Sequence, residues 1–106
     1  MFVHIVFWRL TDAAANGRPK QENALEMKRR FEALPAVIAG LRRCDLGIDV
    51  SQTAESADVA LYMEFDTQAA YEAYNVHQAH KDIVGFIKEV KAERRVVDYE
   101  VGETRV

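Results

Sequence analysis

The chain has 106 residues, of which 49% are hydrophobic and 29% are charged. This composition excludes a disordered chain and predicts one domain, residues 1–106, with a buried core. The 14 basic and 17 acidic residues give a formal charge of −3, which argues against nucleic acid as a partner. The single cysteine, Cys44, excludes an internal disulfide and a four-cysteine zinc site, and favours a reducing compartment.

The opening residues are apolar but do not have the pattern of a targeting segment. They lack a basic region, and Arg9 and Asp12 end the apolar run too early for a signal peptide. No stretch approaches the roughly 18 apolar residues that a membrane span needs. We therefore expect a cytoplasmic protein that has no membrane partner.

The first predicted strand, residues 2–10, is rich in β-branched and aromatic residues and is apolar on both faces. One face carries Phe2, His4, Val6, Trp8 and Leu10, and the other carries Val3, Ile5, Phe7 and Arg9. A helix is predicted over residues 19–34, because Pro19 suits a first helical position and Pro35 prevents continuation. Its apolar stripe consists of Ala24, Met27, Phe31 and Leu34.

The second half of the chain is predicted to contain three more strands. Alternating apolar residues indicate strands over 41–50 and 58–65, and a closing strand is predicted over 95–101. Between the last two strands, Asp66 or Thr67 can cap a short helix that carries Ala70, Tyr71 and Tyr74. After a break at 76–79, a longer helix is predicted over 80–92, with the apolar stripe Ile83, Phe86, Ile87 and Val90.

The order β-α-β-β-α-β predicts an α+β, ferredoxin-like sandwich: a four-stranded antiparallel sheet with helices on one face. The first strand is apolar on both faces, so the uncovered face of the sheet would leave a large apolar patch on a monomer. A second copy packed sheet against sheet is the simplest cover. The sequence thus predicts a homodimer, an α/β barrel with a small-molecule cavity between the two sheets.

The candidate catalytic residues are His4, Tyr74 and His80. His4 lies in an apolar strand, and His77 and His80 flank the break that follows Tyr74. Histidine titrates near neutrality and can take and return a proton, while a tyrosine hydroxyl can donate to a developing oxyanion. We expect Tyr74, His80 and His4 to converge on one cavity. The alternative is a hydrogen-bonded strand histidine and a helix-capping histidine, neither with a chemical role.

Candidate substrate-binding residues are Val6 and Trp8 on the first strand and Tyr62 on the third. For Trp8 a place in the core or the dimer interface is the alternative, and for Tyr62 a cross-strand pair is the alternative. No cofactor is predicted, because the glycines form no phosphate-binding loop. No metal is predicted either, since His77, His80 and His4 offer at most three ligands and nothing supplies a fourth.

Four segments together resemble one known family. They are His4 to Leu10 in the first strand, Gly47-Ile48-Asp49-Val50-Ser51, Tyr74-Asn75-Val76-His77-Gln78-Ala79-His80, and Val96-Val97-Asp98-Tyr99. In this order they resemble the stress-responsive A/B barrel (Dabb) domain. The resemblance covers nearly the whole chain. The chain departs from the family pattern at Gln78, where proline is usual, and at Trp8, where a smaller residue is usual.

The resemblance implies a ferredoxin-like subunit in a dimeric α+β barrel, for which most members have no assigned reaction. In a polyketide cyclase of the family, a tyrosine and a histidine of the Tyr-x-x-His-x-x-His segment serve acid–base chemistry, and these positions fall on Tyr74 and His80. A pocket histidine of the first strand falls on His4, and His77 falls on a structural position.

Two functional hypotheses remain open at this stage. In one, the protein is a cofactor-independent cyclase, lyase or isomerase that acts on a small carbonyl or polyketide-like compound, with His80 and Tyr74 as the acid–base pair. In the other, it is a non-catalytic, ligand-binding or stress-associated dimer. A third hypothesis is a cofactor-independent monooxygenase of the related antibiotic-biosynthesis barrels, which share the fold but not these motifs.

Overall fold

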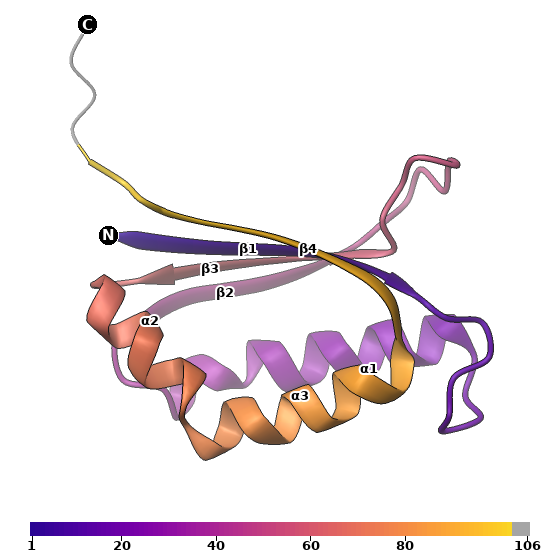
Figure 1. Ribbon diagram of the computed structural model, residues 1–106, viewed down its shortest axis with the longest axis horizontal. Coiled ribbons are helices and arrows are strands. Elements are labelled where there is room, and N and C mark those ends of the chain that lie inside the picture. The colour runs from indigo at the N-terminus through magenta and orange to yellow at the C-terminus, as the bar shows by residue number, and fades with distance from the viewer. Residues whose placement is uncertain (103–106) are drawn as a thin grey trace, which may run out of the picture.

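The computed structural model describes residues 1–102 and has two layers, a sheet and a set of helices that cover one of its faces (Figure 1). The four strands, all antiparallel to their neighbours, lie in the order β2-β3-β1-β4. Their bounds are β1 (Phe2–Leu10), β2 (Leu41–Ile48), β3 (Val59–Phe65) and β4 (Lys91–Glu100). The ferredoxin-like sandwich predicted from the element order is therefore the fold of this chain. The last four residues of the predicted domain lie outside the described residues.

Three α-helices form the second layer: α1 (Lys20–Glu32), α2 (Gln68–Asn75) and α3 (Gln78–Val90). The first helix is shorter than predicted, because the backbone around Pro35 tightens into the 3-10 turn η1 (Leu34–Ala36). None of the helices within residues 1–102 is long and apolar enough to cross a bilayer.

The second connection contains two helices because each has its own capping side chain. The Thr67 Oγ1 accepts a hydrogen bond of 3.1 Å from the backbone N–H of Ala70 at the start of α2. The Nδ1 of His77 accepts one of 2.9 Å from the backbone N–H of Ala79 at the start of α3. The capped N-terminus lets α3 begin at Gln78, two residues before the predicted start.

The closing strand also begins earlier than predicted, at Lys91 rather than Arg95. Lys91 takes an extended backbone conformation directly after α3 and pairs with Leu10 of β1. The second strand ends at Ile48, two residues before the predicted end, and the Asp49 carboxylate accepts from the backbone N–H of Gln52 in the turn that follows. A carboxylate that satisfies a turn in this way favours chain reversal over continued pairing.

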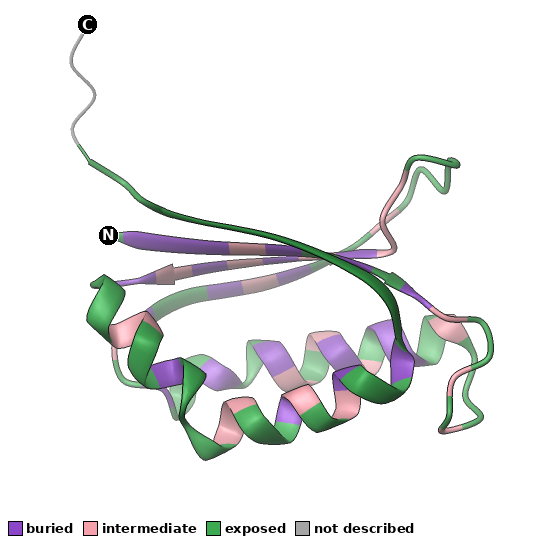
Figure 2. Ribbon diagram, viewed as in Figure 1, coloured by how far each residue is buried: buried purple, intermediate pink, exposed green. Residues whose placement is uncertain are grey.

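The helices cover the face of β1 that carries His4, Val6 and Trp8, and all three residues are buried (Figure 2). This decides which of the two apolar faces is left open. On β1 the open face carries Phe7, which is 44% exposed, and on β4 it carries Val97 (48%) and Tyr99 (44%). The structure thus has the uncovered apolar surface that the sequence predicts.

The link between η1 and β2 depends on Gly40, which takes the left-handed φ of +80°. A Cβ at this position would lie 2.7 Å from the Cβ of Ala70 on α2. Gly17 also has a positive φ, +73°, but its surroundings are open. Substitution of Gly17 therefore measures the cost of backbone strain alone, and substitution of Gly40 adds the cost of a steric clash.

We expect Gly40→Ala to lower the free energy of unfolding by about 2–4 kcal/mol, and Gly17→Ala by only about 1 kcal/mol. Denaturant unfolding monitored by circular dichroism measures both values. Adding Ala70→Gly to Gly40→Ala should recover part of the loss, because it removes the clashing methyl group. Equal losses for the two single variants would show that the contact with Ala70 has no role.

Candidate active site

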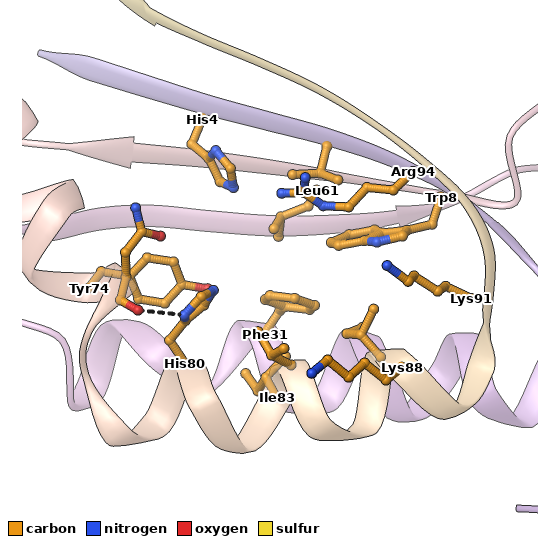
Figure 3. Close-up of a pocket in the computed structure, with 14 residues that line it drawn as sticks. His4, Trp8, Phe31, Leu61, Tyr74, His80, Ile83, Lys88, Lys91 and Arg94 are labelled. Atoms are coloured by element: carbon orange, nitrogen blue, oxygen red, sulfur yellow. Dashed lines mark hydrogen bonds between the residues drawn. The ribbon is translucent and has the colours of Figure 1, made fainter. Parts of the chain in front are cut away.

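A cavity of about 260 Å³ lies between the sheet and the helices of one subunit (Figure 3). Its roof is the helix-covered face of β1 and β4, and its floor is formed by α1 and α3. The apolar part of its wall consists of Val6, Trp8, Phe31, Leu61, Ile83 and Ile87. This cavity is thus closed by the helices of the same chain, and it is a different space from the predicted one between two sheets.

One end of the cavity is formed by His4, whose orientation is fixed by the neighbouring strand. The register of β1 and β4 places His4 directly opposite Asp98, and the His4 Nδ1 donates a hydrogen bond to the Asp98 carboxylate. The ring of Tyr71 packs 4.8 Å from the His4 ring, and its hydroxyl donates to the second Asp98 oxygen over 3.4 Å. With Nδ1 engaged, the His4 Nε2 is the nitrogen available to a ligand.

His80 lies on the first turns of α3 and faces the same end of the cavity (Figure 3). Its Nδ1 lies 3.0 Å from the backbone carbonyl oxygen of Asn75, at the end of α2. A carbonyl oxygen only accepts, so Nδ1 carries the proton and Nε2 has a free lone pair. Within residues 1–102 no protein group bonds to this Nε2.

Burial favours the neutral form of both histidines. Burial lowers the pKa of His4, although the Asp98 carboxylate opposes this by stabilising the imidazolium. Burial also lowers the pKa of His80, and the hydrogen bond to the Asn75 carbonyl opposes it. Two neutral imidazoles near one cavity can each accept a proton near pH 7.

Tyr74 completes the group as a hydrogen-bond donor. Its side chain is 2% exposed, and its ring lies 4.5 Å from the His80 ring in an edge-on arrangement. Burial raises the pKa of the Tyr74 hydroxyl far above its ordinary value, because a phenolate would be poorly solvated there. The hydroxyl therefore stays protonated and can donate to a ligand oxygen.

The structure brings five of the six predicted site residues to this cavity: His4, Val6, Trp8, Tyr74 and His80. Tyr62 does not line it. It lies on the opposite face of the sheet, where its hydroxyl donates to Glu64 over 2.8 Å, two residues along the same strand. Tyr62 alternates with the buried Leu61 and Met63, so its side chain points away from the helices.

Several lining or supporting residues were not singled out from the sequence. Asp98 belongs to a segment already noted for its family resemblance, and pairing the first strand with the last would have placed it beside His4. Arg94 lies on the same strand, and Lys88 and Lys91 lie near the junction of α3 and β4. Asn75 bonds His80 through its backbone, for which the sequence carries no signal.

The cavity shows no arrangement suited to a metal ion. Within the described part of the chain, no group of three or more His, Cys, Asp and Glu side chains is placed to bind one. The His77 Nδ1 is occupied by the cap of α3, which separates it in function from His80.

A family model decides the relationship of this chain to known proteins. The model of the stress responsive A/B barrel domain, Dabb, matches residues 2–101. The chain belongs to the Dabb family. A search of curated protein sequences gives no match.

Solved structures agree with a Dabb assignment. A dimeric protein of unknown function and ferredoxin-like fold from Bacteroides fragilis is 32% identical, with a TM-score of 0.80 over 94% of this chain and 95% of that one. A Dabb family protein from Mesorhizobium loti is 22% identical, with a TM-score of 0.66 over 96% and 97%. A hydroxynitrile lyase from Passiflora edulis is 16% identical, with a TM-score of 0.80 over 99% and 96%, and shares the fold.

We expect Asp98→Asn to lower the pKa of His4 further, because the variant removes the negative charge that stabilises the imidazolium. NMR titration of the His4 Cε1–H resonance measures the change. The matched control is Glu64→Gln, which removes a carboxylate from the opposite face of the same sheet and should leave this pKa unchanged. A His4 pKa that rises or stays constant in Asp98→Asn would contradict the pairing.

Proposed function

We propose that this Dabb protein binds a small carbonyl compound in the cavity and removes a proton next to the carbonyl group. The observation that supports this most strongly is that both imidazoles leave one nitrogen free at the cavity. His4 and His80 each engage Nδ1 with an acceptor, which leaves Nε2 as a base beside the same cavity. The reaction classes that need only such groups are cyclisation, isomerisation and lyase chemistry without a cofactor.

In the proposed step, the His80 Nε2 takes a proton from the carbon beside the carbonyl. The electron pair of the broken C–H bond forms the enolate, and the Tyr74 hydroxyl donates a hydrogen bond to the enolate oxygen. In isomerisation the His80 imidazolium then returns the proton to another carbon. In ring closure the enolate carbon first forms a C–C bond to a second carbonyl carbon of the same molecule, the π pair of that carbonyl moves to its oxygen as an alkoxide, and the imidazolium protonates the alkoxide. His4 orients the ligand by accepting from a ligand hydroxyl.

The directions of the two pKa shifts support His80 as the base and Tyr74 as the hydrogen-bond donor. Burial lowers the pKa of His80 and raises that of Tyr74, so the base stays unprotonated and the donor stays protonated at pH 7. Opposite shifts of two neighbouring groups are typical of an acid–base pair. The alternative function is binding of the same ligand without turnover, and the exchange experiment below separates the two.

We also propose that two copies of the chain associate through the open face of the sheet. Phe7, Val97 and Tyr99 form an apolar surface there that the helices do not cover. The Bacteroides fragilis relative is described as dimeric, as is a ferredoxin-like protein from Thermobifida fusca. A cytoplasmic location stays a prediction from composition.

Proton removal can be measured before the natural substrate is known. We expect the protein to catalyse deuterium uptake at the carbon beside the carbonyl of small aryl ketones in D₂O, followed by NMR. His80→Asn and Tyr74→Phe should each lower the exchange rate by about 10²–10⁴-fold. The rate should rise with pH and level off above an apparent pKa below the ordinary histidine value of about 6.5, because His80 must be neutral to act.

The matched control is His77→Asn, which removes a histidine from the same segment while asparagine keeps a good helix cap. It should exchange at the wild-type rate. Exchange that stays at the wild-type rate in His80→Asn would contradict the mechanism. Ligand binding with no exchange above the solvent background would favour the non-catalytic function.

We expect Phe7→Asp to convert the dimer to a monomer, because a charge would be buried against the partner's apolar surface. Light scattering at micromolar concentration measures the mass. Leu25→Asp is the control, since Leu25 is 59% exposed on α1, away from the open face. A monomeric wild-type protein, or a Phe7→Asp variant that stays dimeric, would overturn the proposed association.

A further inference from the structure

Three cationic side chains line the cavity: Lys88 and Lys91 lie at the end away from the histidines, and Arg94 extends from that end toward His4 (Figure 3). Among the described residues, no carboxylate forms an ion pair with any of the three. The three side chains are partly open to solvent at this end of the cavity, since each residue is exposed overall. Among the other described cations, six have a carboxylate partner and four do not: the paired ones are Lys20, Lys28, Arg29, Arg30, Arg42 and Arg43, and the unpaired ones are Arg9, Arg18, Lys81 and Arg95. We call Lys88, Lys91 and Arg94 the cationic end of the cavity.

Arg94 connects the cationic end with the candidate acid–base group. The register of β1 and β4 places Arg94 directly opposite Trp8, so both side chains lie on the roof of the cavity. Trp8 and His4 are about 13 Å apart along the strand, at roughly 3.3 Å per residue. Figure 3 shows the Arg94 side chain extending back from Trp8 toward His4. Its positive charge acts to lower the pKa of both His4 and His80.

The indole N–H of Trp8 is a second, independent observation at this end. Trp8 is 4% exposed and lines the cavity, and its Nε1 has no hydrogen-bond partner within the described part of the chain. Buried polar groups in proteins are nearly always satisfied, so this unpaired donor beside the cavity is one that a water molecule or a ligand acceptor can satisfy. The cationic end thus combines positive charge with a fixed neutral donor.

Resting on the proposed function, we propose that the substrate is an oxo-carboxylic acid whose carboxylate is held by Arg94, Lys91 and the Trp8 indole N–H. The carbonyl then lies toward His80 and Tyr74. The apolar wall between the two ends, where the Trp8 and Phe31 rings lie 5.6 Å apart, accepts an aromatic or aliphatic body.

The position of the lysines favours a carboxylate over a phosphate. Lys88 lies in the last turn of α3 and Lys91 at its C-cap, where the helix dipole places partial negative charge. Dianionic phosphates are usually bound at the opposite, N-terminal end of a helix or in a glycine-rich loop. The partial negative charge at the end of α3 offsets part of the positive field of these lysines. The remaining field matches a singly charged carboxylate better than a dianionic phosphate.

A matched pair of probes tests the proposal. Isothermal titration calorimetry compares 4-oxo-4-phenylbutanoate with its neutral amide, 4-oxo-4-phenylbutanamide, at fixed ionic strength. We expect the acid to bind the wild-type protein at least about tenfold more tightly, as for a hydrogen bond to a charged group. Arg94→Gln and Lys91→Gln should each remove most of this preference and leave binding of the amide nearly unchanged.

The control variant is Lys81→Gln, which makes the same change of charge on an exposed residue of α3 that does not line the cavity. It should keep the wild-type preference. Equal binding of acid and amide, absence of binding by the acid, or the same loss in Lys81→Gln as in Arg94→Gln would overturn the proposal. Inorganic phosphate that competes with the acid at micromolar concentration would also overturn it in favour of a phosphate site.

The same titrations in His80→Asn separate this proposal from the proposed function. If the preference for the acid persists there and depends on Arg94, the cationic end binds carboxylates whether or not the protein catalyses exchange. If exchange depends on His80 but the acid and the amide bind equally, the acid–base function stands and the cationic end has no part in substrate choice.

Discussion

The candidate site depends on one strand pairing, that of β1 with β4. Its register sets His4 opposite Asp98 and Trp8 opposite Arg94, so a single ladder of backbone hydrogen bonds positions both ends of the cavity. These contacts join residues that are far apart in the sequence. Because side chains alternate across a strand, a slip of one residue would turn His4 and Trp8 toward the open face and remove the cavity roof.

The break between α2 and α3 is the second constraint on the site. The helices do not merge, because His77 caps the start of α3, and the turn brings the Asn75 carbonyl within 3.0 Å of the His80 Nδ1. The two histidines of this segment therefore have different tasks. His77 accepts a hydrogen bond from the backbone N–H of Ala79, and His80 is fixed in the tautomer that presents a base to the cavity.

Local pattern was sufficient to predict the fold and most of the candidate site. The alternation in β3, the period of α1 and the element order lead to a sheet with one covered face, and the motif segments lead to His4, Tyr74 and His80. The pattern could not show which apolar face of β1 the helices cover. Both faces carry residues of similar hydropathy, and this choice decides that the cavity lies under the helices and that Tyr62 lies outside it.

Features that depend on strand register or on backbone atoms were not predicted from the sequence. Asp98 and Arg94 become parts of the cavity only through pairing across the sheet, and the Asn75 contribution is a carbonyl that any residue would supply. The helix and strand ends were off by two to four residues at several places. There, a cap at His77, a turn at Asp49 or immediate pairing of Lys91 outweighed the local preference.

The proposed chemistry requires His4 and His80 to be neutral and to carry the proton on Nδ1. Long-range ¹H–¹⁵N NMR correlation on uniformly labelled protein at pH 7 distinguishes the two neutral tautomers and the imidazolium directly. We predict a protonated Nδ1 and an unprotonated Nε2 for both residues. A proton on the His80 Nε2, whether as the other tautomer or as the imidazolium, would leave no base in the cavity at that position and would contradict the account.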